Sequence, residues 1–152
     1  MITGIHHVAI STPDIERLKK FYTEQLGLTF VGESGWPKGT QLSDTIQSLK
    51  DSEAKVALFK IGNTFIELFE YSSPTPTPQA ADRPVCNHGI THICLDVTDV
   101  DTEYARLKEA GMVFHSEPQI IDENFKTVYG RDPDGNVVEL QELLKKDGPF
   151  AI

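Results

Sequence analysis

The chain has 152 residues and a mass of 16.9 kDa, enough for one ordinary domain or for two small units that share a core. Its net charge of −9 argues against nucleic acid or an anionic membrane as a main partner, because both attract basic surfaces. No apolar run approaches the roughly 20 residues that span a bilayer. The N-terminus enters an apolar strand without a basic segment or cleavage site, so we expect a cytoplasmic protein.

The first half of the chain alternates between strand and helix signals. Thr12-Pro13-Asp14 is typical of a helix start, and Gly27 is well placed to end that helix in a left-handed conformation. Gly62-Asn63 joins two apolar runs as a hairpin turn. The predicted elements are strand 5–11, helix 15–26, a strand from residue 28, and strands 56–61 and 64–71.

The second half repeats this order, which is strand, helix and three strands. Gly-Ile-His-His-Val-Ala-Ile at 4–10 recurs as Gly-Ile-Thr-His-Ile-Cys-Leu at 89–95, and Thr-Phe-Ile-Glu-Leu at 64–68 recurs as Asn-Val-Val-Glu-Leu at 136–140. Internal repetition of this kind indicates two similar units. The predicted elements are strand 90–97, a helix ending at Gly111, a strand from residue 113, and strands 127–131 and 136–142.

Two segments interrupt the repeat. Residues 72–88 are rich in proline and small polar residues and are typical of a linker. Residues 33–55 have no counterpart in the second half and carry the only tryptophan, so they form either a lid over a site or a solvated excursion. The expected organisation is a first module at 1–71 with insertion 33–55, the linker at 72–88, a second module at 89–145 and a tail at 146–152.

Four residues at repeated positions form the candidate site. His7 and His92 occupy the same place in the two copies, and Glu67 and Glu139 each lie between apolar neighbours where an unpaired carboxylate is costly. Period-two alternation allows all four to face a concave interior while the opposite faces pack on helices. Two histidines and two carboxylates suit a divalent metal. The alternative is that each glutamate pairs with a basic residue or is exposed on an edge strand.

The remaining histidines have no repeated partner, and we interpret them as structural. They are His6, His88 and His115.

The duplicated pattern resembles the vicinal oxygen chelate superfamily, which includes glyoxalase I, methylmalonyl-CoA epimerase, extradiol dioxygenases and bleomycin- or fosfomycin-resistance proteins. The resemblance rests on His-His-Val-Ala-Ile at 6–10, Phe-Tyr-x-x-x-Leu-Gly at 21–27, Gly-Ile-Thr-His-Ile at 89–93 and Asp-Pro-Asp-Gly-Asn-x-x-Glu-Leu at 132–140. It implies an α+β fold in which two βαβββ modules form a half-open, cup-shaped mixed sheet around a metal.

The resemblance also implies the metal ligands, His7, Glu67, His92 and Glu139. They would bind one divalent ion per site (Zn, Ni, Co, Mn or Fe), with the modules paired within one chain or across a homodimer.

For activity, the resemblance implies a lyase or isomerase that passes through a metal-chelated enediolate or enolate of a small 2-oxo or thioester substrate. Proton transfer would fall to Glu139, with Glu67 as a ligand or second base, and the near-symmetry of the repeat allows these roles to be exchanged. Glyoxalase I typically has arginine and asparagine where this chain has Ser11 and Tyr71. Lactoylglutathione itself is therefore not the expected substrate.

Aromatic residues on the Glu67 strand favour a substrate with an apolar or aromatic portion. The candidate substrate-binding residues are Phe65, Phe69, Tyr71, Ser11 and Trp36.

Two other interpretations stay open. An Fe(II) extradiol-type dioxygenase acting on an aromatic diol would use His7, His92 and Glu139, although Glu67 would occupy a position that oxygen chemistry needs open. A bleomycin-resistance-like protein would only bind a small molecule, and such relatives often lack metal ligands.

Overall fold

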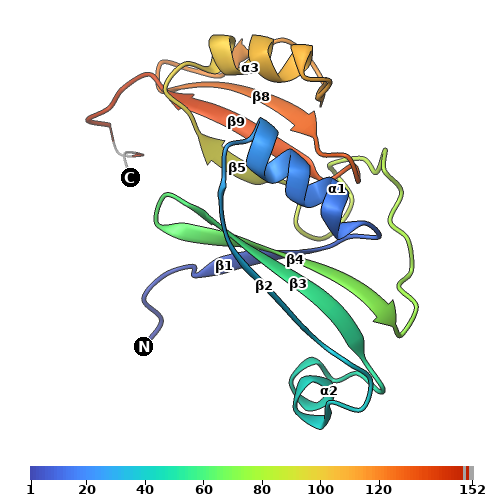
Figure 1. The fold of residues 1–152 in the computed structure, drawn as a ribbon. Coiled ribbons are helices and arrows are strands. Elements are labelled where there is room, and N and C mark those ends of the chain that lie inside the picture. Colours follow the sequence, from blue (N-terminus) through green and yellow to red (C-terminus); the bar gives the residue numbers. More distant parts are fainter. Residues whose placement is uncertain (149, 151–152) are drawn as a thin grey trace. The chain divides into compact units, whose positions relative to one another are not determined.

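The computed structural model describes residues 1–148 and 150, and it divides into two compact units, Met1–Pro78 and Gln79–Ile152 (Figure 1). Each unit combines helices with a mixed sheet, which confirms the predicted α+β class. Within the part of the chain that is described, no helix is long and apolar enough to cross a membrane.

The first unit has the predicted βαβββ order with one additional helix, α2. In its sheet the strands follow the order β1-β4-β3-β2, with β1 parallel to β4 and the other pairs antiparallel. The elements are β1 His7–Ser11, α1 Ile15–Lys20, the π-helical turn η1 Phe21–Gln25, β2 Thr29–Trp36, α2 Gln41–Gln47, β3 Glu53–Ile61 and β4 Thr64–Ser73.

The start of α1 is fixed by two carboxylates. Asp14, the last residue of the predicted helix start Thr12-Pro13-Asp14, is the N-cap and accepts a hydrogen bond from the amide of Arg17 at 3.0 Å. Glu70, on β4, accepts the amide hydrogen of Ile15 at 2.8 Å. These bonds satisfy amides that no helical carbonyl can reach, and they fasten the helix to the sheet.

One face of the first sheet forms the hydrophobic core of its unit. Leu18 of α1 is fully buried, together with Ala57, Phe59 and Leu68 of the sheet. The opposite face carries His7 and Glu67 and remains partly open, because every second residue of a strand points to the other side.

The segment 33–55 is partly strand. β2 continues to Trp36 and β3 begins at Glu53, so only residues 37–52 leave the sheet. Asp44 of α2 folds this excursion onto itself by accepting hydrogen bonds from the amides of Asp51 and Ser52 and from the Ser52 hydroxyl.

The second unit repeats the topology with a broken edge strand. Its order is β5-β9-β8-β6, and β7 also pairs with β8, so the two short strands together take the place that β2 has in the first unit. The elements are β5 Ile93–Asp96, α3 Val100–Glu109, β6 Val113–Phe114, β7 Gln119–Ile120, β8 Phe125–Arg131 and β9 Val137–Leu143.

The helix start of the second unit repeats that of the first. Asp99 caps α3 by accepting from the amide of Thr102 at 3.0 Å, and Glu142 accepts from the amide of Val100 at 3.1 Å. In both units the capping glutamate lies three residues after the candidate site glutamate. The duplication seen in the sequence therefore extends to long-range contacts.

The end of the proline-rich segment is attached to the second unit. The Arg131 guanidinium donates to the carbonyls of Ala81, Arg83 and Gly135, and the Arg83 guanidinium donates to the carbonyl of Ile90. Gly135 is required in this arrangement, since its φ is +87° and a Cβ there would lie 2.1 Å from the Ala81 oxygen. Residues 81–90 thus pack beside the turn that joins β8 to β9.

Candidate metal centre

Strand register determines which candidate residues share a face. In the parallel pair β1–β4, His7 lies beside Phe65 and Ala9 lies beside Glu67, so His7 and Glu67 point to the same side of the first sheet. In the second unit Glu139 lies between Cys94 of β5 and Tyr129 of β8. His92 directly precedes β5.

The first histidine–glutamate pair is partly exposed. His7 Nε2 lies 3.6 Å from Glu67 Oε2, and the two side chains are 44% and 23% exposed. His7 Nδ1 is 2.9 Å from His6 Nδ1, and the His6 ring stacks on Phe65 with centroids 5.1 Å apart. His6 therefore contacts both His7 and Phe65.

The second pair is tighter and more buried. His92 Nε2 lies 2.9 Å from Glu139 Oε2, with side-chain exposures of 28% and 8%. Thr91 Oγ1 is 2.9 Å from His92 Nδ1, and the ring of Tyr129 lies 4.9 Å from the imidazole. The other carboxylate oxygen, Glu139 Oε1, accepts from the hydroxyl of Thr127 at 2.5 Å.

These pairs fit the geometry of metal ligands. Two ligands at about 2.1 Å from an ion lie about 3.0 to 3.4 Å apart for bond angles between 90° and 109°. The observed separations of 2.9 and 3.6 Å are close to this range. Each Nδ1 has another partner and each Nε2 faces the carboxylate, an arrangement common in metal-binding histidines.

The structure brings the four residues together as two pairs, one in each unit. Among residues 1–148 and 150, no group of three or more His, Cys, Asp or Glu residues gathers in a way that could hold an ion. Each pair supplies one imidazole nitrogen and one carboxylate oxygen, which is half of the predicted ligand set.

Two neighbours of Glu139 carry perturbed acid groups. Cys94 is an exposed residue, but partial desolvation of its thiol, together with the charge of Glu139 and a hydrogen bond to it, raises the pKa of Cys94 to about 12. Burial, again with a contribution from Glu139, raises the pKa of Tyr129. Both groups are therefore protonated at neutral pH, and neither adds a second negative charge beside Glu139.

The candidate substrate-binding residues lie in the first unit on the face of Glu67. Phe69 and Tyr71 stack with centroids 5.7 Å apart, and Trp36 lies 6.1 Å from each. We call Trp36, Phe69 and Tyr71 the aromatic wall. Ser11 lies beside Phe69 in the β1–β4 register, and Phe65 lies at the opposite end, against His6.

The excursion 37–52 contacts the aromatic wall through two hydrogen bonds. The Tyr71 hydroxyl donates to Gln47 Oε1 of α2, and Trp36 Nε1 donates to Ser52 Oγ at 2.9 Å. Burial and the charge of Glu67 raise the pKa of Tyr71. The insertion thus helps to position the wall.

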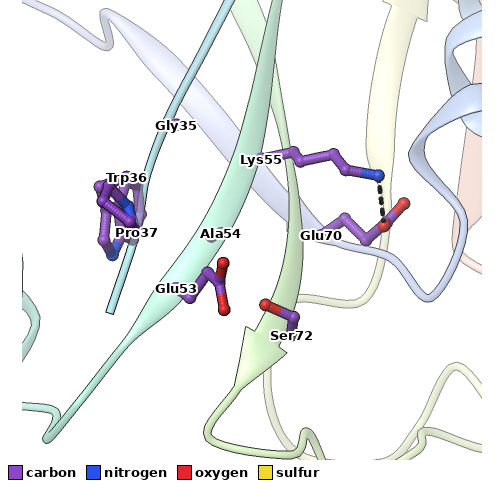
Figure 2. A pocket seen from close by; sticks show the side chains of 8 residues that line it. All are labelled: Gly35, Trp36, Pro37, Glu53, Ala54, Lys55, Glu70 and Ser72. Carbon is purple, nitrogen blue, oxygen red and sulfur yellow. Dashed lines mark hydrogen bonds and ion pairs between the residues drawn. The ribbon is translucent and has the colours of Figure 1, made fainter. Parts of the chain in front are cut away.

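A separate pocket of about 310 Å³ lies at the end of β2, β3 and β4 (Figure 2). Trp36 and Pro37 form one side, and the ion pair between Lys55 and Glu70, at 3.1 Å, lies on the other. None of the four candidate ligands lines it. The pocket borders the aromatic wall only at Trp36.

Comparison with known proteins identifies the family. The sequence model of the Glyoxalase/Bleomycin resistance protein/Dioxygenase superfamily matches residues 4–140. The chain belongs to this superfamily. The family predicted from the repeated motifs is thereby confirmed.

Several curated relatives of this superfamily member are epimerases. An ethylmalonyl-CoA/methylmalonyl-CoA epimerase of Cereibacter sphaeroides is 30% identical over 94% of this chain and all of its own length. The 2-epi-5-epi-valiolone epimerase of an Actinomyces species is 29% identical, over 92% of this chain and 79% of that protein. The bovine mitochondrial methylmalonyl-CoA epimerase is 27% identical, over 91% and 73%.

Solved structures show the same fold. A glyoxalase family protein from Bacillus cereus superposes with a TM-score of 0.85 at 20% identity, covering 95% of this chain and 97% of that one. A variant of the fosfomycin resistance protein FosX from Listeria monocytogenes, crystallised with Mn(II) and 1S,2S-dihydroxypropylphosphonic acid, has a TM-score of 0.64 at 18% identity, covering 95% and 94%.

The residues that surround Glu139 did not emerge from the sequence. Thr127 and Tyr129 share its face, since period-two alternation on β8 places both on the side of Glu139. The alternation of residues along β8 was the sequence signal that could have pointed to Thr127 and Tyr129. Thr91 directly precedes His92, and the sequence showed it only as part of the repeated motif.

Proposed function

We propose that this protein is a divalent-metal-dependent isomerase or lyase of the glyoxalase superfamily, most similar in chemistry to its epimerase relatives. The observation that carries the proposal is the pair of histidine–glutamate contacts at equivalent positions of the two units, at 3.6 and 2.9 Å. The proposed substrate is a small 2-oxo compound or thioester whose carbon-bound proton lies next to a carbonyl.

The proposed ligands of one ion are His7, Glu67, His92 and Glu139. Neutral imidazoles and carboxylates suit Zn, Ni, Co, Mn or Fe in the divalent state. When bound, such an ion supplies a positive charge that stabilises the oxygen of an enolate or enediolate. The two histidines would hold their Nε2 atoms toward the ion through the Nδ1 contacts to His6 and Thr91.

Proton transfer is assigned to the carboxylates. Glu139 would accept the proton from the substrate carbon, and Glu67 would serve as ligand or second base. An epimerase must remove a proton from one face of a carbon and return one to the other face, so two carboxylates from two repeats suit this task.

The aromatic wall would bind the apolar or aromatic portion of the substrate. Along β4 successive residues rise by about 3.4 Å, so Phe69 and Tyr71 lie roughly 7 and 14 Å from Glu67 in the strand direction. Ser11 and Phe65 would line the part nearest the proposed ion. Substrate selectivity would then depend on residues that the second unit does not repeat.

The decisive test combines metal content with proton exchange. Purified protein should carry about one divalent ion per proposed His2Glu2 site, and H7A/H92A should carry none. In deuterated buffer, methylmalonyl-CoA and a panel of 2-oxo compounds should reveal one substrate whose α-proton exchanges with wild type but not with E139Q. Full metal occupancy of H7A/H92A would rule out the ligand assignment. Absence of exchange with every compound, together with tight binding of one of them, would favour a binding protein.

A mixing experiment tests the proposed homodimer. One variant, H7A/E67Q, lacks the first pair, and another, H92A/E139Q, lacks the second. If two chains share each ion, co-expression should yield mixed dimers with one intact site and measurable activity. If one chain supplies all four ligands, mixing should restore nothing.

A further inference from the structure

Thr127 makes the two site glutamates unequal. Its Oγ1 lies 2.5 Å from Glu139 Oε1 and 2.9 Å from the carbonyl oxygen of Leu140, and the residue is 8% exposed. The hydroxyl carries one hydrogen, so the two acceptors compete for it or share it, and the shorter distance favours donation to Glu139 Oε1.

The first unit has no such hydroxyl. Thr127 lies opposite Gln141, two residues beyond Glu139, and the equivalent position opposite Phe69, two residues beyond Glu67, is occupied by Val56. Among the residues that the structure describes, the hydrogen-bonding and ionic contacts of Glu67 consist of its approach to His7 at 3.6 Å. The equivalent sheet position therefore supplies a hydrogen-bond donor to Glu139 in the second unit and an aliphatic side chain in the first.

We infer that Thr127 is a positioning residue, which holds the carboxylate of Glu139 so that Oε2 is presented beside His92 Nε2. Oε1 of Glu139 accepts from the hydroxyl, and Oε2 lies 2.9 Å from the imidazole nitrogen. Hydrogen-bonded supports of this kind typically change metal affinity 10- to 100-fold when removed. The inference rests on the proposed metal function, because it assigns Thr127 a role toward the proposed ion.

The first test is a titration with Mn(II), followed by the electron paramagnetic resonance signal of the free ion. T127V retains the size of the side chain but loses the hydroxyl, and it should bind Mn(II) about 10- to 100-fold more weakly. T127S retains the hydroxyl and should stay within about threefold of wild type. T23V is the matched control, since it removes a hydroxyl that bonds a helical carbonyl in the first unit, and it should leave affinity unchanged.

Two results would overturn the inference: T127V with the affinity of wild type, or T127S as weak as T127V. A structural role of Thr127 through the Leu140 carbonyl alone is separated by a double-mutant cycle with E139L, which leaves no side-chain acceptor at position 139, measured by urea unfolding of metal-free protein. If Thr127 acts on Glu139, the effect of T127V on the unfolding constant should fall at least threefold in the E139L background, whereas equal effects in both backgrounds would refute the role.

The cycle also separates this inference from the proposed function. If wild type binds no Mn(II) and is isolated without an ion, the proposed metal chemistry fails. The metal-free cycle then still decides whether Thr127 positions Glu139.

Discussion

The unequal burial of the two histidine–glutamate pairs predicts unequal costs when a histidine is removed from the metal-free protein. His92 contacts a carboxylate whose side chain is 8% exposed, whereas the partner of His7 is 23% exposed and His7 itself is 44% exposed. The perturbations are H92A and H7A, which delete the same chemical group from equivalent positions of the repeat. We expect H92A to destabilise the fold clearly more than H7A.

The magnitude follows from what is left behind. Removing one member of a buried ionic pair typically costs 3 to 5 kcal/mol, because the other charge stays buried without its partner. The Thr127 hydroxyl still satisfies one oxygen of Glu139, which lowers this cost.

We therefore expect H92A to lose about 2 to 3 kcal/mol. We expect H7A to lose less than about 1 kcal/mol of unfolding free energy, because His7 is more than a third exposed and water can replace its contact with Glu67. The difference of about 2 kcal/mol corresponds to roughly 4 to 8 °C in Tm for a chain of this size.

The measurement is urea and thermal unfolding in EDTA, followed by far-ultraviolet circular dichroism. H88A is the control for loss of an imidazole, because His88 is exposed in the segment before β5. Equal losses for H92A and H7A, or a larger loss for H7A, would refute the reasoning from burial.

Two further predictions use single reporter groups. Hydrogen bonds from the Ser52 hydroxyl and amide lower the pKa of Asp44. The ionised carboxylate therefore stabilises the excursion above about pH 3.8, and this stabilisation is lost as the pH falls further. Trp36 fluorescence should change as the pH falls through this range, and D44N should abolish the change. Cys94 is exposed, like Cys86, but partial desolvation of its thiol and the neighbouring charge of Glu139 raise its pKa to about 12. The thiolate fraction of Cys94 should be about a thousandfold below that of an ordinary thiol, but a thiolate of higher pKa is also roughly 30-fold more nucleophilic. Alkylation of Cys94 at pH 8 should therefore be roughly 30-fold slower than alkylation of Cys86. Equal rates for the two cysteines would contradict the environment described for Cys94.

The repeat and the faces of its strands could be predicted because both depend on local pattern. Period-two alternation groups His7 with Ala9 on one strand and Glu67 with Phe65 on another, and the β1–β4 register then places both groups on one face. The start of the first helix was equally local, since Asp14, within the predicted start Thr12-Pro13-Asp14, caps the helix through the amide of Arg17, three positions away. Neither the alternation within a strand nor this cap requires knowledge of which strands pair.

The supports of the site could not be predicted because they join residues far apart in sequence. Glu70 reaches the amide of Ile15 across 55 positions, and Thr127 reaches Glu139 only because β8 pairs with β9 in one register. A shift by one residue would move Thr127 to the opposite face. A hydroxyl within an apolar strand has no sequence signature that separates a support from an ordinary surface residue.

Differences at equivalent positions explain how a duplicated fold can hold two unequal carboxylates. Beside Glu67 the sheet presents Val56 and Leu58, and at the same register beside Glu139 it presents Thr127 and Tyr129. These substitutions leave the backbone pairing intact, because both sets suit a strand. They change the side chains that flank each carboxylate, which include a hydroxyl bonded to Glu139 in one unit and two aliphatic side chains beside Glu67 in the other. A carboxylate held at one place beside a histidine suits the proton-accepting role proposed for Glu139, and a less constrained one suits the role of ligand or second base proposed for Glu67. Duplication can therefore supply the symmetric ligand set, and a few later substitutions can separate the roles of its members.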